Sequence, residues 1–193
     1  MEDLDLRDAT LVGFLMSGGE VARSVTNHGQ DRLRCVMFAA AVPSYRMKSD
    51  DHPDGPLTDD KAKEMVGGLT ADRDGFCDAF TTAFVSANGV LKVSEQDRQD
   101  AIAVCKLFDQ AAALGCMKAF ATTDLRVDLP NVTVPKLVLH GDSDAIVPFQ
   151  GSGERTHAAI QGSELVVLKD APHGCNASHA DEFNAALIEF LKR

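Results

Sequence analysis

An acidic residue and a histidine near the C-terminus have the types and order needed for a hydrolytic triad. An apolar run ends at His140, and Asp144 follows in the next turn, while His173 lies later in a Pro-His-Gly segment. In acyl transfer a hydroxyl attacks, an imidazole accepts its proton, and a carboxylate orients the imidazole. We therefore predict His173 as the general base and Asp144 as the orienting carboxylate, with Asp142 as a competing acid.

The third group, a nucleophilic serine, is expected upstream in a Gly-x-Ser-x-Gly turn between a strand and a helix. The sequence at that place reads Gly13-Phe-Leu-Met-Ser-Gly-Gly19, with Leu15 at the centre of the motif. A shift of two positions puts Ser17 at the turn, with the N–H of Gly18 as the oxyanion donor. Two interpretations of Ser17 remain open, a nucleophile or the N-cap of the following helix.

The elements that would position these residues alternate between strands and helices. The sequence predicts strands at Thr10–Phe14, Cys35–Val42, Lys136–His140 and Glu164–Leu168, and helices at Gly18–His28, about 151–160 and Ala180–Leu191. Gly29 suits a helix end, and Pro43 ends the second strand. Nearly continuous apolar strands between helices are typical of a parallel sheet covered on both faces. The carboxyl ends of such strands would bring the three groups together.

A long segment without a core strand separates the second and third of these strands. Its polar start, Ser49–Asp60, is predicted as a loop, and Lys61–Ala87 and Ser94–Leu114 are predicted helical with no strand between them. Ser94 and Asp97 have the spacing of a capping box. We interpret residues 49–120 as a helical cap inserted into a core of residues 1–48 and 121–193. The predicted fold class is α/β, with a four-stranded parallel half-sheet.

Short motifs extend over nearly all of the chain outside this insertion. They are Thr10-Leu-Val-Gly-Phe, Gly18-Gly-Glu-Val-Ala-Arg, Ala39-Ala-Ala-Val-Pro, Ala121-Thr-Thr-Asp-Leu-Arg-Val-Asp-Leu, Val134-Pro-Lys-Leu-Val-Leu-His-Gly-Asp-Ser-Asp-Ala-Ile-Val-Pro, Ala171-Pro-His-Gly and His179-Ala-Asp-Glu-Phe-Asn. Together they resemble the α/β-hydrolase fold, and within it the non-haem chloroperoxidase and arylesterase group. The resemblance implies that Asp144 is the acid, that His173 is the base, and that no haem, metal or other cofactor is needed.

The resemblance also implies a partial fold. Chains of that family begin earlier, with further strands and a loop that supplies one oxyanion N–H, whereas this sequence starts at the helix before the nucleophile strand. The strand at Thr10–Phe14 would then be an open edge of the sheet. Exposed apolar edges tend to pair with another chain, so we expect a homodimer or a larger homo-oligomer through this edge.

The composition excludes several classes of partner. The 193 residues suffice for a full core, and the net charge of −10 disfavours nucleic acid and anionic membrane surfaces. No apolar run has the length of a membrane span, and the acidic N-terminus is unlike a signal peptide. The five scattered cysteines lack metal or redox spacing and are typical of reduced thiols, which predicts a cytoplasmic protein.

The function that these observations predict is hydrolysis of a small carboxylic ester by Ser17, His173 and Asp144, with Gly18 in the oxyanion site. Perhydrolysis or lactone opening would use the same groups. The alternative is a non-catalytic relative of the hydrolases that binds a small molecule or a partner. Leu15 favours this alternative because its side chain cannot attack a carbonyl.

Overall fold

The centre of the protein is a parallel sheet of four strands in the order β1-β2-β5-β6. A computed structural model describes residues 1–42, 44–53 and 55–193. The strands are β1 (Ala9–Phe14), β2 (Leu33–Ala39), β5 (Lys136–Gly141) and β6 (Glu164–Leu168). All three neighbouring pairs are parallel, which confirms the predicted sheet. Pro43, predicted to end the second strand, lies outside the described residues.

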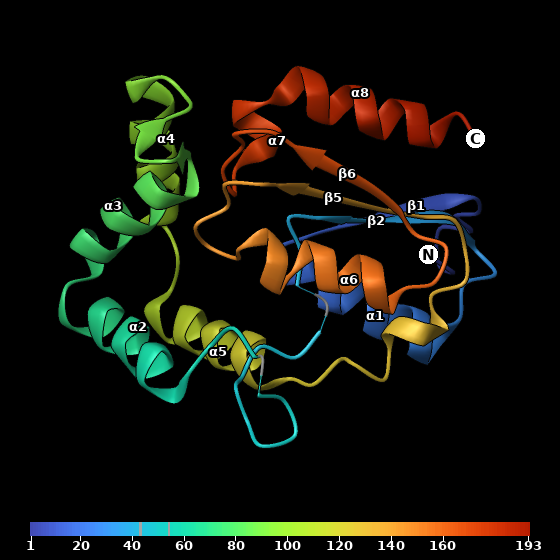
Figure 1. Ribbon diagram of the computed structural model, residues 1–193, viewed down its shortest axis with the longest axis horizontal. Helices are drawn as coiled ribbons and strands as arrows, with labels where there is room; N and C mark the ends of the chain where they lie inside the picture. The colour runs from blue at the N-terminus through green and yellow to red at the C-terminus, as the bar shows by residue number, and fades with distance from the viewer. Residues whose placement is uncertain (43, 54) are drawn as a thin grey trace.

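Helices cover both faces of the sheet, as Figure 1 shows. On one face lie α1 (Ser17–His28) and α6 (Gly153–Ala159), and on the other α7 (Cys175–Ser178) and α8 (Ala180–Leu191). Because side chains of a strand alternate in direction, β2 sends Val36 and Phe38 into the core beside α1 and sends Met37 into the core beside α8. The strand is therefore apolar at almost every position.

Helix α1 follows its sequence pattern closely. Val21, Ala22 and Val25 form its buried stripe, and Gly29 ends it with φ of 73° while its N–H donates to the Val25 carbonyl. A positive φ favours glycine, which explains why the helix stops there. The predicted helix end is confirmed.

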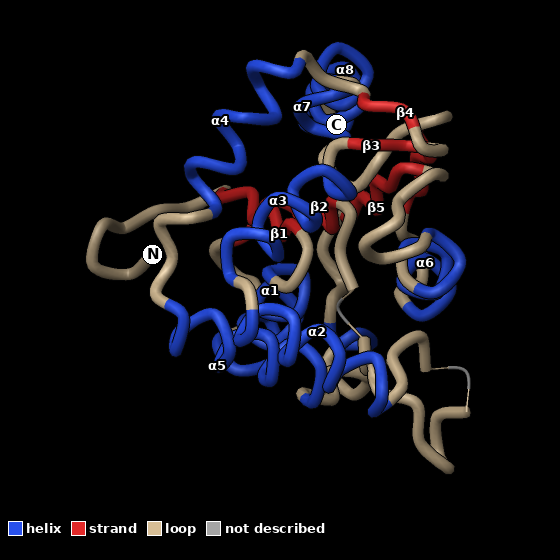
Figure 2. Tube along the Cα trace, turned by 90° about the vertical axis from the view of Figure 1, so that its left-hand side faces the viewer, coloured by secondary structure: helices blue, strands red, loops and turns tan. Residues whose placement is uncertain are grey.

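The segment after β2 forms four helices beside the carboxyl ends of the strands. They are α2 (Asp59–Ala71), α3 (Arg73–Phe84), α4 (Glu95–Cys105) and α5 (Gln110–Thr122). Figure 2, viewed from that side, shows α3 in front of the strands, with α2 and α5 below them. The prediction that Lys61–Ala87 is helical holds as far as Phe84, but the segment forms two helices, because the Asp72 side chain accepts from the Gly75 N–H and starts a new helix. The predicted Ser94–Leu114 helix is likewise divided, since Asp109 caps α5 through the Ala112 N–H.

The prediction that no strand separates these helices is wrong. A small antiparallel hairpin joins β3 (Ser86–Ala87) to β4 (Val90–Leu91) through Asn88 and Gly89, whose φ angles are 52° and 75°. Asn-Gly is the residue pair that such a two-residue hairpin turn favours. The predicted capping box after the hairpin is confirmed, because Ser94 and Asp97 bond reciprocally at the start of α4.

Two short 3-10 helices complete the described chain. They are η1 (Leu129–Asn131), before β5, and η2 (Phe149–Gly151), before α6. Within the described ranges, no helix has the length and apolar character needed to cross a bilayer.

Candidate active site

The turn between β1 and α1 has Leu15 at its apex. Leu15 has a φ of 53°, the left-handed conformation that a strand-to-helix nucleophile turn requires. Strand and helix approach closely below it, since a Cβ added at Gly13 would lie 2.6 Å from the Ser17 carbonyl oxygen and 2.7 Å from Gly18 Cα. Only glycine fits at position 13. The turn therefore follows the unshifted Gly-x-Leu-x-Ser reading of the motif.

Ser17 does not occupy the apex, so the predicted shift of two positions is wrong. It is the first residue of α1, behind Met16, which takes the N-cap position without a side-chain cap bond. The described residues contain no hydrogen bond between the Ser17 hydroxyl and His173, whose Nε2 is buried and has no hydrogen-bond partner. The N-cap interpretation of Ser17 is not matched either.

The oxyanion donor expected at Gly18 is also placed differently. The Gly18 N–H points back to the Leu15 carbonyl at 3.4 Å, inside the turn. Gly18 itself is buried, and a Cβ there would lie 2.5 Å from Ala41 Cβ. In a nucleophile turn the donor is the N–H of the residue after the apex, here Met16, for which no backbone acceptor occurs among the described residues.

Asp144 and His173 meet beyond the ends of β5 and β6, as predicted for an acid and its base. His173 Nδ1 lies 2.6 Å from Asp144 Oδ2, and both side chains are buried. The other carboxylate oxygen accepts the N–H groups of Ile146 and Val147, each at 2.8 Å. These bonds fix the carboxylate in its turn, so that it holds the His173 ring in one orientation.

His140, at the end of β5, also contacts the acid. Its Nε2 lies 2.9 Å from the Val147 carbonyl oxygen, which can only accept, and 3.1 Å from Asp144 Oδ2. Burial would raise the pKa of Asp144, but the hydrogen bonds from His140 and His173 outweigh it and lower the pKa to about 2. An ionised Asp144 can only accept, so both imidazoles donate an N–H to it, and in the neutral His173 ring this leaves Nε2 as the acceptor nitrogen. That is the state of a general base.

The competing acid, Asp142, has a different role. It accepts the Asp170 N–H at 2.7 Å and the Ser143 hydroxyl at 2.8 Å, which ties the loop after β6 to the end of β5. Its side chain is exposed, and Asp144 is the carboxylate that bonds His173.

Aromatic rings enclose the free side of His173. The rings of Phe14 and Phe84 meet the imidazole edge-to-face, with centroids 5.1 Å and 4.7 Å away. The Gly174 N–H also donates to the Phe84 carbonyl at 2.7 Å, so α3 is attached directly to the histidine loop. The His173 ring is therefore shielded from solvent.

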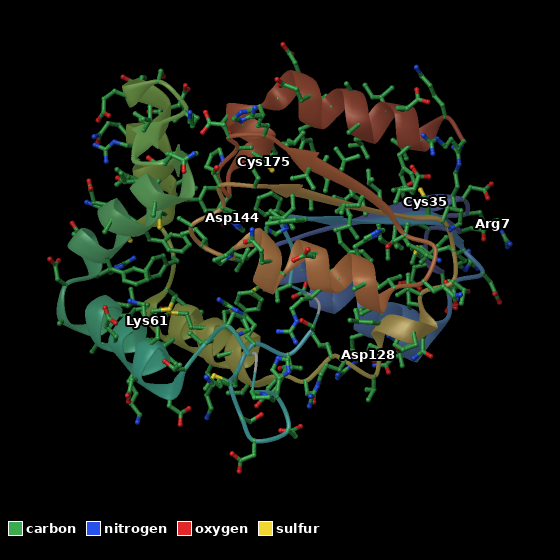
Figure 3. The ribbon with its side chains drawn as sticks, in the orientation of Figure 1. Arg7, Cys35, Lys61, Asp128, Asp144 and Cys175 are labelled. Carbon is green, nitrogen blue, oxygen red and sulfur yellow. The ribbon has the colours of Figure 1, made fainter. Side chains whose placement is uncertain are left out.

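A largely apolar cavity of about 610 Å³ lies between the helices α2–α5 and the strand ends. Leu15 lines it, together with apolar residues of the helices, whereas Ser17 does not. Among the lining residues are Met65, Leu69, Phe76, Phe80 and Phe120. In Figure 3 Lys61, another lining residue, lies on α2 across from Asp144 at the end of the sheet. The volume falls within the range of small-molecule sites.

A thiol close to the acid–histidine pair has a raised pKa. Cys175 is a buried free thiol, and burial together with the charge of Asp144 raises its pKa to about 12, which disfavours the reactive thiolate. No set of three or more His, Cys, Asp or Glu side chains in the described parts of the chain is arranged to hold a metal ion.

The sheet order, the strand–turn–helix at Leu15 and the acid–histidine pair after the later strands define a partial α/β-hydrolase fold. The chain is 36% identical over 198 residues to the non-heme chloroperoxidase CPO-A1 of Kitasatospora aureofaciens, covering all of this chain and 71% of that protein. The bifunctional esterase/perhydrolase DCH of Acinetobacter calcoaceticus is 30% identical over 199 residues, with 100% and 70% covered. This chain belongs to the non-haem chloroperoxidase and perhydrolase group of α/β-hydrolases.

Solved structures agree with this assignment. The bromoperoxidase of Bacillus anthracis superposes with a TM-score of 0.96 at 46% identity, and the esterase EaEST of Exiguobacterium antarcticum with 0.89 at 26%. The whole of this chain matches 70% and 69% of those chains. No protein-family model matches the sequence.

Among the cavity residues that the sequence did not predict is Arg46. It follows β2 in an irregular segment, and its guanidinium carbon lies 4.4 Å from the centre of the Phe120 ring. The only sequence signal was a basic residue soon after the carboxyl end of a central strand. The contribution of His140 to the acid was also missed, because a strand-end histidine is more often a packed core residue.

Proposed function

We propose that this chain binds a small molecule with an apolar part in the cavity between α2–α5 and the sheet, without acyl transfer at the turn. The observation that supports this is Leu15, which takes the left-handed apex of the turn and lines the cavity. Leucine has no hydroxyl or thiol to attack a carbonyl. The site thereby keeps the shape of an acyl pocket and lacks the group that would bond the acyl carbon.

The helices around the cavity suit an acyl or alkyl chain. Aromatic rings and methionines from three of them line it, and the Phe76 and Phe80 rings stack 5.9 Å apart on α3. Burying an alkyl chain against such a surface contributes about 25 cal/mol for each Å² removed from water. A ligand of this kind needs no covalent bond to be held.

A second candidate is hydrolysis of a small carboxylic ester through Ser17, and the intact Asp144–His173 pair favours it. The relatives named as an esterase and a perhydrolase make ester hydrolysis, perhydrolysis or lactone opening the reactions to test. For this reaction the Ser17 hydroxyl would have to reach the buried His173 Nε2, to which it makes no hydrogen bond among the described residues. The proposal of binding alone needs no such contact.

Turnover of a short-chain chromogenic ester separates the two candidates. We expect no turnover above buffer with the wild-type chain, and no difference on Ser17→Ala. Turnover that disappears in Ser17→Ala would establish the esterase and overturn the proposal of binding without catalysis.

Titration calorimetry with octanamide tests the binding itself. We expect saturable binding that Ala83→Trp weakens at least tenfold, because Ala83 lines the cavity and the indole would fill it. Ala103→Trp on the exposed surface of α4 is the matched control and should bind as the wild type does. Equal affinity in both tryptophan variants would place the ligand elsewhere.

A further inference from the structure

Both charged residues in the described lining of the cavity are basic. Arg46 and Lys61 line it, and none of its described lining residues is an aspartate or glutamate, although the chain has a formal net charge of −10. The rest of the lining is mainly apolar. A ligand with an apolar body and a single anionic group matches both features.

The two cations are not equivalent. Lys61 forms an ion pair with Glu64 at 2.9 Å and has a side chain that is 57% exposed, so its charge is already compensated. Arg46 forms no ion pair within the described part of the chain, and its buried Nε lacks a hydrogen-bond partner. Burial lowers the pKa of Arg46, while the charge of Asp144 raises it. The oxygens of Asp144 already accept four other donors.

The guanidinium of Arg46 lies over an aromatic ring. Its central carbon is 4.4 Å from the centre of the Phe120 ring, and its buried Nε has no hydrogen-bond partner among the described residues. A planar guanidinium presents paired donors that match the two oxygens of a carboxylate. An anion at the guanidinium would give Arg46 the direct ion pair that it lacks in the described part of the chain.

We infer that Arg46 binds the carboxylate of a medium-chain monocarboxylic acid whose alkyl chain lies among Met65, Leu69, Phe76 and Phe80. This inference rests on the proposed binding function and gives it a ligand class. The carboxylate and Arg46 form a charge-assisted pair inside a cavity of low polarity, where such pairs are stronger than in water.

The test compares octanoate with octanamide, which has the same alkyl chain and no charge, by titration calorimetry at pH 8. The wild type should bind octanoate at least tenfold more tightly than octanamide. In Arg46→Met the ratio of the two affinities should fall close to one, because only the binding of octanoate is weakened. Arg46→Lys should keep part of the preference for octanoate. Lys63→Met removes a nearby exposed cation outside the cavity and should leave the ratio unchanged.

Each outcome separates the carboxylate inference from the proposed function. Equal affinity of the wild type for the two ligands would overturn the role of Arg46 and leave apolar binding intact. If the preference for octanoate over octanamide persists in Arg46→Met and disappears in Lys61→Met, the carboxylate is bound by Lys61, and the role inferred for Arg46 is overturned. Absence of binding by both ligands would overturn both proposals. Circular dichroism of Arg46→Met verifies its fold, and the wild-type comparison needs no variant.

Discussion

Leu15 combines an uncommon backbone conformation with a side chain that faces a cavity. A left-handed φ costs a leucine on the order of 1–2 kcal/mol, so the surrounding strand and helix must hold it there. The same conformation would present a serine hydroxyl toward His173. The geometry of a nucleophile turn is thus retained without the nucleophile.

Leu15→Ser should therefore gain reactivity with a serine-directed fluorophosphonate. We expect labelling about 10²-fold faster than in the wild type, at the low end of what a positioned general base contributes. Intact mass spectrometry measures the adduct. Adding His173→Ala to Leu15→Ser is the control and should abolish the gain. Equal labelling of wild type and Leu15→Ser would show that position 15 does not face the base.

Asp144 makes the stability of the fold depend on acid pH. Its pKa is about 2 in the folded chain, below the ordinary value of 3.8, so the unfolded chain binds more protons between these values. The stabilisation is fully present above about pH 4 and is lost as the pH falls through about 2, a change on the order of 2 kcal/mol. Urea unfolding of wild type and Asp144→Asn at pH 2 to 7 measures it.

The difference in unfolding free energy between the wild type and Asp144→Asn should be smaller at pH 2 than at pH 7, by on the order of 2 kcal/mol. Asp142→Asn serves as control, because Asp142 is exposed and bonds loop groups only. A difference for Asp144→Asn that does not change with pH would contradict the assigned ionisation.

The meeting of Asp144 and His173 could be predicted from sequence, whereas the residue at the apex of the β1–α1 turn could not. Asp144 and His173 each follow a strand whose apolar run is unambiguous, so their meeting point is set by the sheet. Whether Leu15 or Ser17 occupies the apex of the turn depends on only three residues. Shifting the motif by two positions leaves the apolar patterns of the flanking strand and helix equally consistent with the sequence. The contact of Gly13 with the helix backbone decides it, and that contact exists only in three dimensions.

At the scale of elements, the close approach of β1 and α1 depends on Gly13, which has no side chain. Gly13→Ala should lower the unfolding free energy by at least about 2 kcal/mol, because its Cβ would collide with backbone atoms that cannot move aside. Gly67→Ala is the matched control. Gly67 is an exposed position of α2 with no atom within 4 Å of an added Cβ, so alanine should raise stability by about 0.5–1 kcal/mol.

Thermal or urea unfolding of both variants gives the comparison. A Gly13→Ala variant as stable as Gly67→Ala would mean that β1 and α1 are separated further than the structure has them.

The core elements were predictable because each has a strong periodic pattern, and β6 and α8 match their predicted limits. The helices over the sheet were harder. Their breaks at Asp72 and Asp109 come from side-chain caps within polar stretches, and these are weak signals beside apolar periodicity. The Asn88-Gly89 hairpin had a clear turn signal, but its strands of two residues are too short to show alternation.

For the whole molecule, β1 is an edge strand with an exposed apolar residue. Val12 is 48% exposed on it, and Leu4 and Leu6 are exposed nearby. We propose that two copies associate through this edge. Val12→Lys should convert a dimer into a monomer, because a lysine opposes edge-to-edge pairing.

Light scattering coupled to gel filtration measures the mass. Val167→Lys, at an exposed valine of the opposite edge strand β6, should leave the mass of the dimer unchanged. A monomeric wild type, or dissociation caused only by Val167→Lys, would rule out the β1 edge as the interface.

The pairing of β2 with β5 has a consequence for how the chain reaches this fold. Val36 pairs with Lys136, so two central strands meet only after the whole helical segment between them has been made. Contacts between such distant residues slow folding. On the ribosome, β2 emerges with Met37 uncovered, since residues of β5 and α8 complete its burial. The nascent chain should therefore expose this apolar surface until its last third is synthesised.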